Sequence, residues 1–495
     1  MGLGLLILVS VGKENIYLSA QPEITFFKIA YKRHTNYSIE QTPQYFKTTP
    51  DFGRKCTVNI GKNADLIGQT YLYIELPDVI KENFTSDTSS IKKFAWVEKI
   101  GLALINYVEI EIGGTIIDRH YGDWLNIWNE MTISIGHRKS YDKMIGNIKE
   151  LYEYSDNKST HVLYIPFSFW FCQDTGLCLP LIALSHHDIK IHVDFNDINS
   201  CYKLSPSYYI DVSNNYCILE PGEKFYQIYQ NDKIIGEFVY FNQLTQKIYY
   251  NPIKGKFNIP NSDQDTKLKL IGDKSKFEIF IKPNTVVVED EDYFKFIKPS
   301  FIKSYLLVNY IYLDNFERYN FLNNAHEYLI PVVQTLPEQI ILSINSIYKI
   351  PFINPIKFIA WRAILKSNIE SKNIFNYSTY PYTNDKDYLI KNNSLLINSI
   401  KRMELDSIQY YTNVPIYQSK LMNKQFGIYY YSFGLNPTDL QPSGSMNFSK
   451  IDDSYLQFKM NPIVNYQNPV NIRCYGIQYN LFRVSDGIGG LGFNI

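Results

Sequence analysis

The sequence predicts an all-β protein with two tandem domains and few short helices. Aromatic residues make up 16% of the 495 residues, including 42 Tyr and 30 Phe, and this composition suits pleated strands and interfaces. Charged residues reach only 20%, which argues against disorder and long coiled coils. Short strand-like runs separated by turn clusters outnumber helical patterns, as is typical of sandwiches and barrels.

Eight strand-like runs mark the first domain, expected over residues 23–314 after an N-terminal arm over 1–22. The clearest hairpin joins Tyr107–Ile112 to Thr115 across Gly113-Gly114, two positions free to adopt positive φ. The stretch 196–303 is β-like as well, and we interpret it as an insertion into this domain. The expected strands span residues 24–31, 54–61, 67–76, 105–112, 115–121, 161–169, 186–195 and 304–313.

A second domain is expected over residues 331–495, because the strand pattern resumes after Pro331. A helical linker over 315–330 separates the domains, and a second helix is expected from Trp124 to Ile135 with Asp123 as its cap. The expected strands of the second domain are 339–350, 356–365, 409–411, 428–433, 454–460 and 471–480.

Charge and cysteine content restrict the environment and the partners. Lys+Arg and Asp+Glu both number 49, so no overall positive field gathers phosphates, which argues against a nucleic-acid coat. Six scattered cysteines without a CxxC pair indicate reduced thiols. The apolar run from Leu3 to Val11 is too short to span a bilayer and lacks a basic flank. It could instead dock as a buried arm against a partner subunit.

Candidate chemical sites are weak. His186, Asp188 and His192 would share one face of a strand, but no further ligand completes a metal site and Lys190 lies on that face. Residues 487–492 match GxGxxG, yet only three residues follow where a helix is required. Asp118-Arg119-His120 and Asp123 favour a hydrogen-bonded corner over acid–base catalysis. We therefore expect no enzyme, with no catalytic residues, no cofactor and no metal.

Several stretches in both halves share one family's sequence pattern. The most specific runs from YSFGLNP at residues 431–437 to QPSGSMNFS at residues 441–449. Further matching stretches are 16–37, 113–114, 122–130, 165–172, 179–184, 308–314, 317–318, 326–330 and 489–491. Together they resemble the double jelly-roll major capsid proteins of nucleocytoplasmic large DNA viruses.

The resemblance implies two tandem eight-stranded jelly rolls in each chain. It also implies a homotrimer that forms a pseudo-hexagonal capsomer and tiles the icosahedral shell of the virion. The implied partners are the chain itself, neighbouring capsomers, minor capsid proteins and inner viral membrane proteins, with no specific nucleic acid. The implied location is the virion capsid, after synthesis and assembly in the host cytoplasm.

Two other functions remain open from the sequence. One is a transient double jelly-roll scaffold that shapes the viral membrane and is absent from the finished particle. The other is a glycan-binding jelly-roll protein, because a Tyr-rich surface could stack sugars. In the capsid interpretation, the long connections of the first domain gather at one end, so we expect 196–303 to form a tower on the outer surface.

Overall fold

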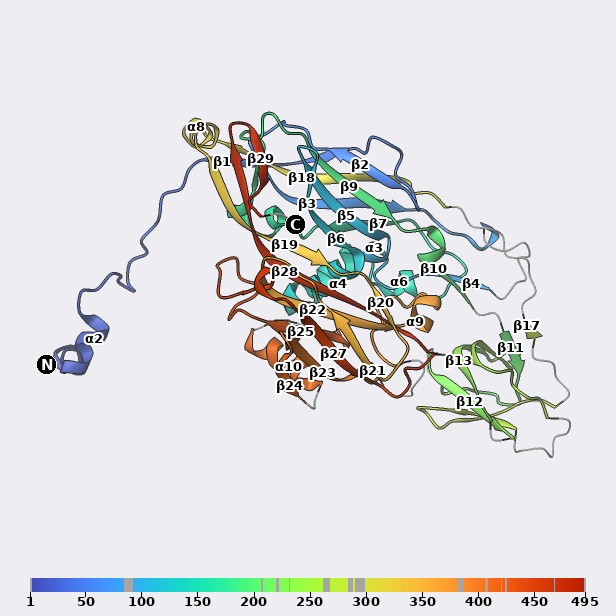
Figure 1. The fold of residues 1–495 in the computed structure, drawn as a ribbon. Helices are drawn as coiled ribbons and strands as arrows, with labels where there is room; N and C mark the ends of the chain where they lie inside the picture. The colour runs from blue at the N-terminus through green and yellow to red at the C-terminus, as the bar shows by residue number, and fades with distance from the viewer. Residues whose placement is uncertain are drawn as a thin grey trace.

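The computed structural model contains two β-sandwiches side by side and a third β-structured unit at one end (Figure 1). It describes residues 2–83, 92–205, 208–219, 222–230, 232–260, 268–283, 288–289, 299–380, 386–405, 408–419, 421–422, 425–466 and 468–493. Each sandwich pairs two sheets whose main paths have four antiparallel strands, the architecture of a jelly roll. The predicted all-β fold with two tandem jelly rolls is confirmed.

The first roll is formed by residues that lie on both sides of the insertion. One of its sheets follows the order β1-β18-β3-β7, with β8 on β3, and the other follows β2-β9-β5-β6. The strands are β1 (Tyr37–Gln44), β2 (Lys55–Asn59), β3 (Leu66–Leu76), β5 (Ile105–Ile112), β6 (Thr115–Tyr121), β7 (His161–Pro166), β8 (Leu179–Pro180), β9 (Ile189–Phe195) and β18 (Lys303–Leu313).

Alternation along β3 shows why these residues form a half-buried strand. Leu72, Ile74 and Leu76 face the core, whereas Tyr71 and Tyr73 face outward and remain partly exposed. The β5–β6 hairpin turns at Gly113 and Gly114 with φ of 58° and 85°, so the predicted two-residue turn is confirmed.

The second roll has the same arrangement of two sheets. One follows the order β19-β28-β22-β25, with β20, β26 and β29 attached, and the other follows β21-β27-β23-β24. The strands are β19 (His326–Thr335), β20 (Gln339–Ile341), β21 (Asn345–Lys349), β22 (Pro355–Leu365), β23 (Ile390–Ile397), β24 (Ile400–Leu405), β25 (Ile428–Ser432), β26 (Met446–Asn447), β27 (Ser454–Met460), β28 (Val470–Ser485) and β29 (Ile488–Leu491).

The insertion between β9 and β18 forms a sheet and a hydrophobic core of its own, as Figure 1 shows at the end opposite the N-terminal segment. Its first strand, β10 (Tyr202–Ser205), leaves the roll and pairs with β4 (Lys93–Trp96). The remaining strands are β11 (Tyr208–Asp211), β12 (Lys224–Tyr229), β13 (Asp232–Asn242), β14 (Lys247–Lys254), β15 (Lys269–Gly272), β16 (Glu278–Phe280) and β17 (Val288–Glu289).

Helices are short and lie between or beside the sheets. They are α1 (Leu3–Val9), α2 (Ile16–Ser19), α3 (Ile100–Ala103), α4 (Gly122–Thr132), α5 (Ile135–Met144), α6 (Lys149–Tyr152), α7 (Trp170–Gln173), α8 (Asn315–Asn323), α9 (Lys366–Glu370) and α10 (Gln409–Gln418). Among the described helices, none has the length and apolar content needed to cross a bilayer. The six cysteines form no disulfide bond with one another.

The predicted strand over 24–31 is wrong, and the first strand is β1. Residues 24–31 lie in a segment that extends away from the rolls (Figure 1), where Phe26 and Phe27 are 91% and 98% exposed. The residue types favour a strand, but in the part of the chain that the structure describes no strand pairs with them.

Three predictions around the second roll are also wrong. Helix α8 ends at Asn323, and the following residues form β19, an edge strand that tolerates Pro331 because it pairs on one side only. Residues 409–411 begin helix α10, where Tyr411 packs its ring edge-on against Trp361. The stretch 339–350 divides into β20 and β21, which belong to different sheets.

Candidate functional site: the junction between the two rolls

Helix α4 lies between the two rolls and connects their cores. Trp124 is buried, and its ring centroid lies 5.2 Å from that of Tyr475 in the second roll. Trp128 stacks at 6.3 Å on Phe358 of the second roll. Gly122 begins the helix where a Cβ atom would lie 2.4 Å from the Ile105 carbonyl oxygen, so only glycine fits. The indole pair therefore joins the two rolls through apolar contact.

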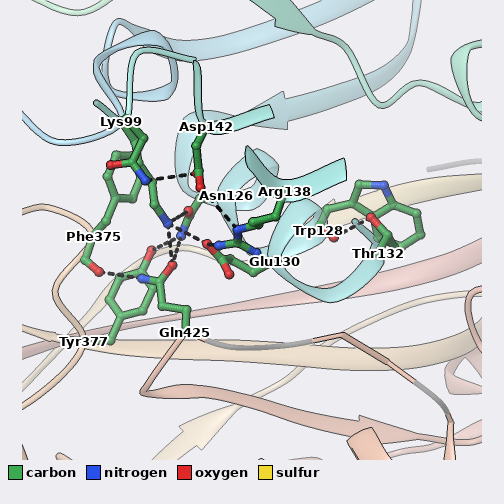
Figure 2. Close-up of polar contacts among 11 residues, drawn as sticks. Lys99, Asn126, Trp128, Glu130, Thr132, Arg138, Asp142, Phe375, Tyr377 and Gln425 are labelled. Carbon is green, nitrogen blue, oxygen red and sulfur yellow. Dashed lines mark hydrogen bonds and ion pairs between the residues drawn. The ribbon is translucent and has the colours of Figure 1, made fainter. Parts of the chain in front are cut away.

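A buried polar network around Lys99 crosses the same boundary (Figure 2). The Lys99 Nζ donates to Asn126 Oδ1 at 2.6 Å, to Glu130 Oε1 at 2.7 Å and to Gln425 Oε1 at 2.8 Å. Asn126 and Glu130 belong to α4, whereas Gln425 comes from the second roll and also donates to the Phe375 carbonyl oxygen. One ammonium group thus holds side chains from both rolls.

The charges of this network depend on one another. Burial lowers the pKa of Lys99, although the nearby Glu130 carboxylate opposes that shift. Burial alone would raise the pKa of Glu130, but Lys99 and Arg138 outweigh it and the pKa is lowered. Arg138 also pairs with Glu130, so this carboxylate neutralises two cations. Removing Glu130 would leave buried positive charge uncompensated, the costly case for an internal ion pair.

A second ion-pair group centres on Asp123, in the first turn of α4. The predicted capping role of Asp123 is wrong, because Tyr121 occupies the N-cap position. Asp123 Oδ2 instead lies 2.8 Å from Arg362 Nη2 and 3.4 Å from Arg473 Nη1, both from the second roll. Burial alone would raise the pKa of Asp123, but the two guanidinium groups lower it. Arg362 also pairs with Glu338 at 2.8 Å.

The predicted hydrogen-bonded corner on β6 contacts the edge of the second roll. Asp118 Oδ1 accepts a hydrogen bond from the Val333 amide of β19 at 3.1 Å. Its other oxygen lies 2.9 Å from His120 Nε2. These contacts make the corner part of the junction.

The histidines considered as metal ligands lie apart. His192, on β9, contacts the Thr57 hydroxyl at 2.8 Å and the Glu111 carboxylate at 2.9 Å. His186 and Asp188 precede β9, which begins at Ile189. In the residue ranges given above, no cluster of three or more His, Cys, Asp or Glu could hold a metal ion.

The C-terminal hairpin β28–β29 explains the glycine-rich motif. The His186 amide donates to the Gly487 carbonyl oxygen at 3.0 Å, and the Gly489 amide donates to His187 Nδ1 at 3.2 Å. A Cβ atom on Gly487 would lie 2.3 Å from the Ser185 hydroxyl oxygen, and φ there is +79°. These glycines let the hairpin of the second roll approach the first roll closely.

The sequence placed Trp124 and Asp123 on the expected helix but gave no role to Lys99, Gln425 or Arg362. Of these, Arg362 had a usable signal, because it is one of two cations, with Lys357, in the otherwise apolar run Pro355–Leu365. A charge inside a buried strand requires a partner. The partner itself could not be read from the sequence, because Asp123 is far away along the chain.

Comparison with known proteins covers the whole chain. Residues 25–231 match the family described as "Major capsid protein N-terminus", and residues 317–490 match "Large eukaryotic DNA virus major capsid protein". The probable capsid protein 4 of Acanthamoeba polyphaga mimivirus is 35% identical over 508 residues, covering 99% of both chains. This chain belongs to the major capsid protein family of large eukaryotic DNA viruses.

Further relatives agree with this capsid family. The major capsid protein of Phaeocystis pouchetii virus is 29% identical over 99% of both chains. The Faustovirus major capsid protein has the same fold, with a TM-score of 0.68 at 11% identity, covering 96% of this chain and 94% of that chain. A chain of the PBCV-1 virus capsid gives a TM-score of 0.62 at 21% identity, covering 95% and 100%. The predicted family is confirmed, and its function is that of a viral capsid protein.

Proposed function

We propose that the chain forms a homotrimer, a pseudo-hexagonal capsomer that tiles the icosahedral shell of a large DNA virus. The observation that carries this proposal is the junction, where the ion pairs of Asp123 with Arg362 and Arg473 and the hydrogen bond from Lys99 to Gln425 fix one roll against the other. A tile must keep its outline when it contacts neighbours, and two rolls joined by a loose linker would not. Membership of the capsid family supports the same role.

Light scattering on the purified chain tests the trimer. The expected mass is three times the chain mass of 57.9 kDa at micromolar concentration and moderate salt. A monomer mass under these conditions would overturn the trimer. Mass spectrometry of purified particles tests the place in the shell, because the transient-scaffold alternative requires the chain to be absent from finished virions.

The insertion forms the outward tower in this proposal. Its own sheet and core support a unit that can vary without disturbing the rolls. Protease should cut this unit first on intact particles, and a short Gly/Ser linker in its place should leave the trimer folded. Failure of the shortened chain to form trimers would contradict the tower.

The remaining roles follow from the capsid proposal. The chain acts without catalysis, metal or cofactor, binds DNA only weakly, and contacts neighbouring capsomers, minor capsid proteins and inner viral membrane proteins. Synthesis and assembly take place in the host cytoplasm. Tight DNA binding at physiological salt, or one zinc per chain after chelator washing, would contradict this part.

A further inference from the structure

Four tyrosines form a continuous row across the outer face of the β1-β18-β3-β7 sheet. Tyr305 is the cross-strand partner of Tyr73, and Tyr73 is the partner of Tyr164. Tyr45 directly follows β1 and extends the row beside Tyr305, at a centroid distance of 5.7 Å. Tyr45 is 63% exposed and Tyr164 is 39% exposed, so the row lies open on the subunit surface.

Neighbouring rings of the row pack on one another. Tyr73 and Tyr305 stack at 4.4 Å with 14° between their planes, and Tyr164 meets Tyr73 edge to face at 5.2 Å. Sugar stacking uses an open ring face, whereas the Tyr73–Tyr305 stack covers one face of each of its two rings. The geometry therefore disfavours a glycan and suits a protein surface that alternates apolar and polar groups.

The size of the face favours a weak, repeated contact. The face is four strands wide, at about 4.8 Å per strand, and about five residues long, at about 3.3 Å per residue. Its area is therefore roughly 300 Å². Permanent oligomer interfaces bury roughly 2,000 Å² or more in total and are more apolar. The neighbouring cross-strand pair is charged, with Lys303 opposite Glu75. Such a face fits a contact between preformed trimers better than one inside a trimer.

The charges on this face are self-complementary. The Lys303 ammonium lies 5.3 Å from the Tyr305 ring centroid. Consider a two-fold axis parallel to the strands that passes between β18 and β3. It places Tyr305 against the second copy's Tyr73, and Lys303 against the second copy's Glu75. Two reciprocal ion pairs and one tyrosine row then form a closed, isologous contact.

We propose that this face, defined by Tyr45, Tyr73, Tyr164, Tyr305 and the Lys303/Glu75 pair, is a two-fold contact between neighbouring capsomers. The occupant is the same face of a second copy of this chain. The inference rests on the proposed function, because it describes how the trimers meet. It assigns a specific surface to contacts that tiling requires.

Charge reversal tests the symmetry directly. Lys303→Glu sets two carboxylates against two others, and Glu75→Lys sets ammonium groups against one another. Each single variant should weaken the concentration-dependent association of trimers by roughly three- to tenfold in sedimentation at low salt. The double variant Lys303→Glu/Glu75→Lys should restore association, since an isologous contact regains both pairs.

Controls separate this inference from the proposed trimer. Lys254→Glu makes the same charge change on an exposed residue of β14 and should leave association unchanged. Tyr73→Ser/Tyr305→Ser should weaken association with trimer mass unaltered.

Loss of the trimer in unmodified protein contradicts the proposed function alone. The two-fold contact is overturned if the single variants associate as strongly as unmodified protein. It is also overturned if the double variant associates no more strongly than the single variants. Loss of association only after deletion of residues 2–23 would make the N-terminal arm the occupant and overturn it as well.

Discussion

Two of the contacts between the second roll and the rest of the chain use cations differently. At the junction, Arg362 and Arg473 of the second roll lie within ion-pair distance of the Asp123 carboxylate on α4. At the base of the insertion, Lys372 lies 4.5 Å from the Tyr202 ring centroid and Lys224 lies 4.9 Å from that of Tyr380. The Tyr380 hydroxyl also donates to the Gly222 carbonyl oxygen at 2.6 Å.

The difference explains how one chain combines a rigid tile with a variable tower. Buried ion pairs with several hydrogen bonds permit one relative orientation of the rolls, because any other leaves charges unpaired. A cation over a ring contributes only about 0.5–2 kcal/mol and tolerates small shifts. We therefore expect the insertion to open locally at lower free energy than the rolls.

Replacing Asp123 should have the largest effect. Asp123→Ala leaves Arg362 and Arg473 without their shared carboxylate and should lower the free energy of unfolding by about 3–5 kcal/mol. Asp156→Ala is the control, because Asp156 is exposed and lies 3.9 Å from Lys81. It should cost under about 1 kcal/mol in the same urea titration. Equal losses for the two variants would contradict the importance of the ion pairs.

Replacing Gln425 should have an intermediate effect. Gln425→Ala removes the acceptor for Lys99 and Asn126 inside the junction and should cost about 1–3 kcal/mol, measured by urea unfolding. Gln246→Ala breaks an exposed bond to Asn215 and provides the comparison, with a cost near zero. A Gln425 variant as stable as unmodified protein would show that Lys99 does not hold the rolls together.

Replacing Tyr380 should loosen the insertion and leave the rolls intact. Tyr380→Phe removes the hydrogen bond to Gly222 and should lower the free energy of opening the insertion by about 1 kcal/mol. Hydrogen exchange should rise in the described strands of the insertion, with the main unfolding transition unmoved. Tyr466→Phe, at an exposed tyrosine, should change neither quantity. Faster exchange throughout both rolls would mean that the insertion and the rolls open as one unit.

The smallest expected effect is a pH dependence of local opening in the insertion. Burial lowers the pKa of Lys224 from 10.5 to about 8. Between these values the unfolded chain retains a proton that the folded insertion releases, so stability rises as the pH increases through this range. Hydrogen exchange in the insertion, corrected for intrinsic rates, should slow from pH 8 to 9. The corresponding rise in the free energy of opening should be under about 1 kcal/mol. Lys224→Met should remove the dependence, and its persistence in that variant would contradict the assignment.

The same comparison shows what the sequence could reveal. Alternation and turn residues located most strands of the first roll, because these are local signals. The insertion lies between β9, which ends at Phe195, and β18, which begins at Lys303. The strand predicted over residues 409–411 is a helix instead, because packing of Tyr411 on Trp361 outweighs strand propensity. The polar contacts of the junction could not be predicted for another reason. Lys99 and Gln425 are 326 positions apart in the sequence, and no local pattern encodes their pairing.

The central claim is that each chain is a rigid two-roll unit of a trimeric capsomer. Single-particle electron microscopy of the purified chain tests it most directly. The expected result is a trimer of pseudo-hexagonal outline in which all three copies show one relative orientation of the rolls, with weaker density for the insertion. Monomers, or trimers whose two rolls vary in relative orientation from copy to copy, would contradict the account.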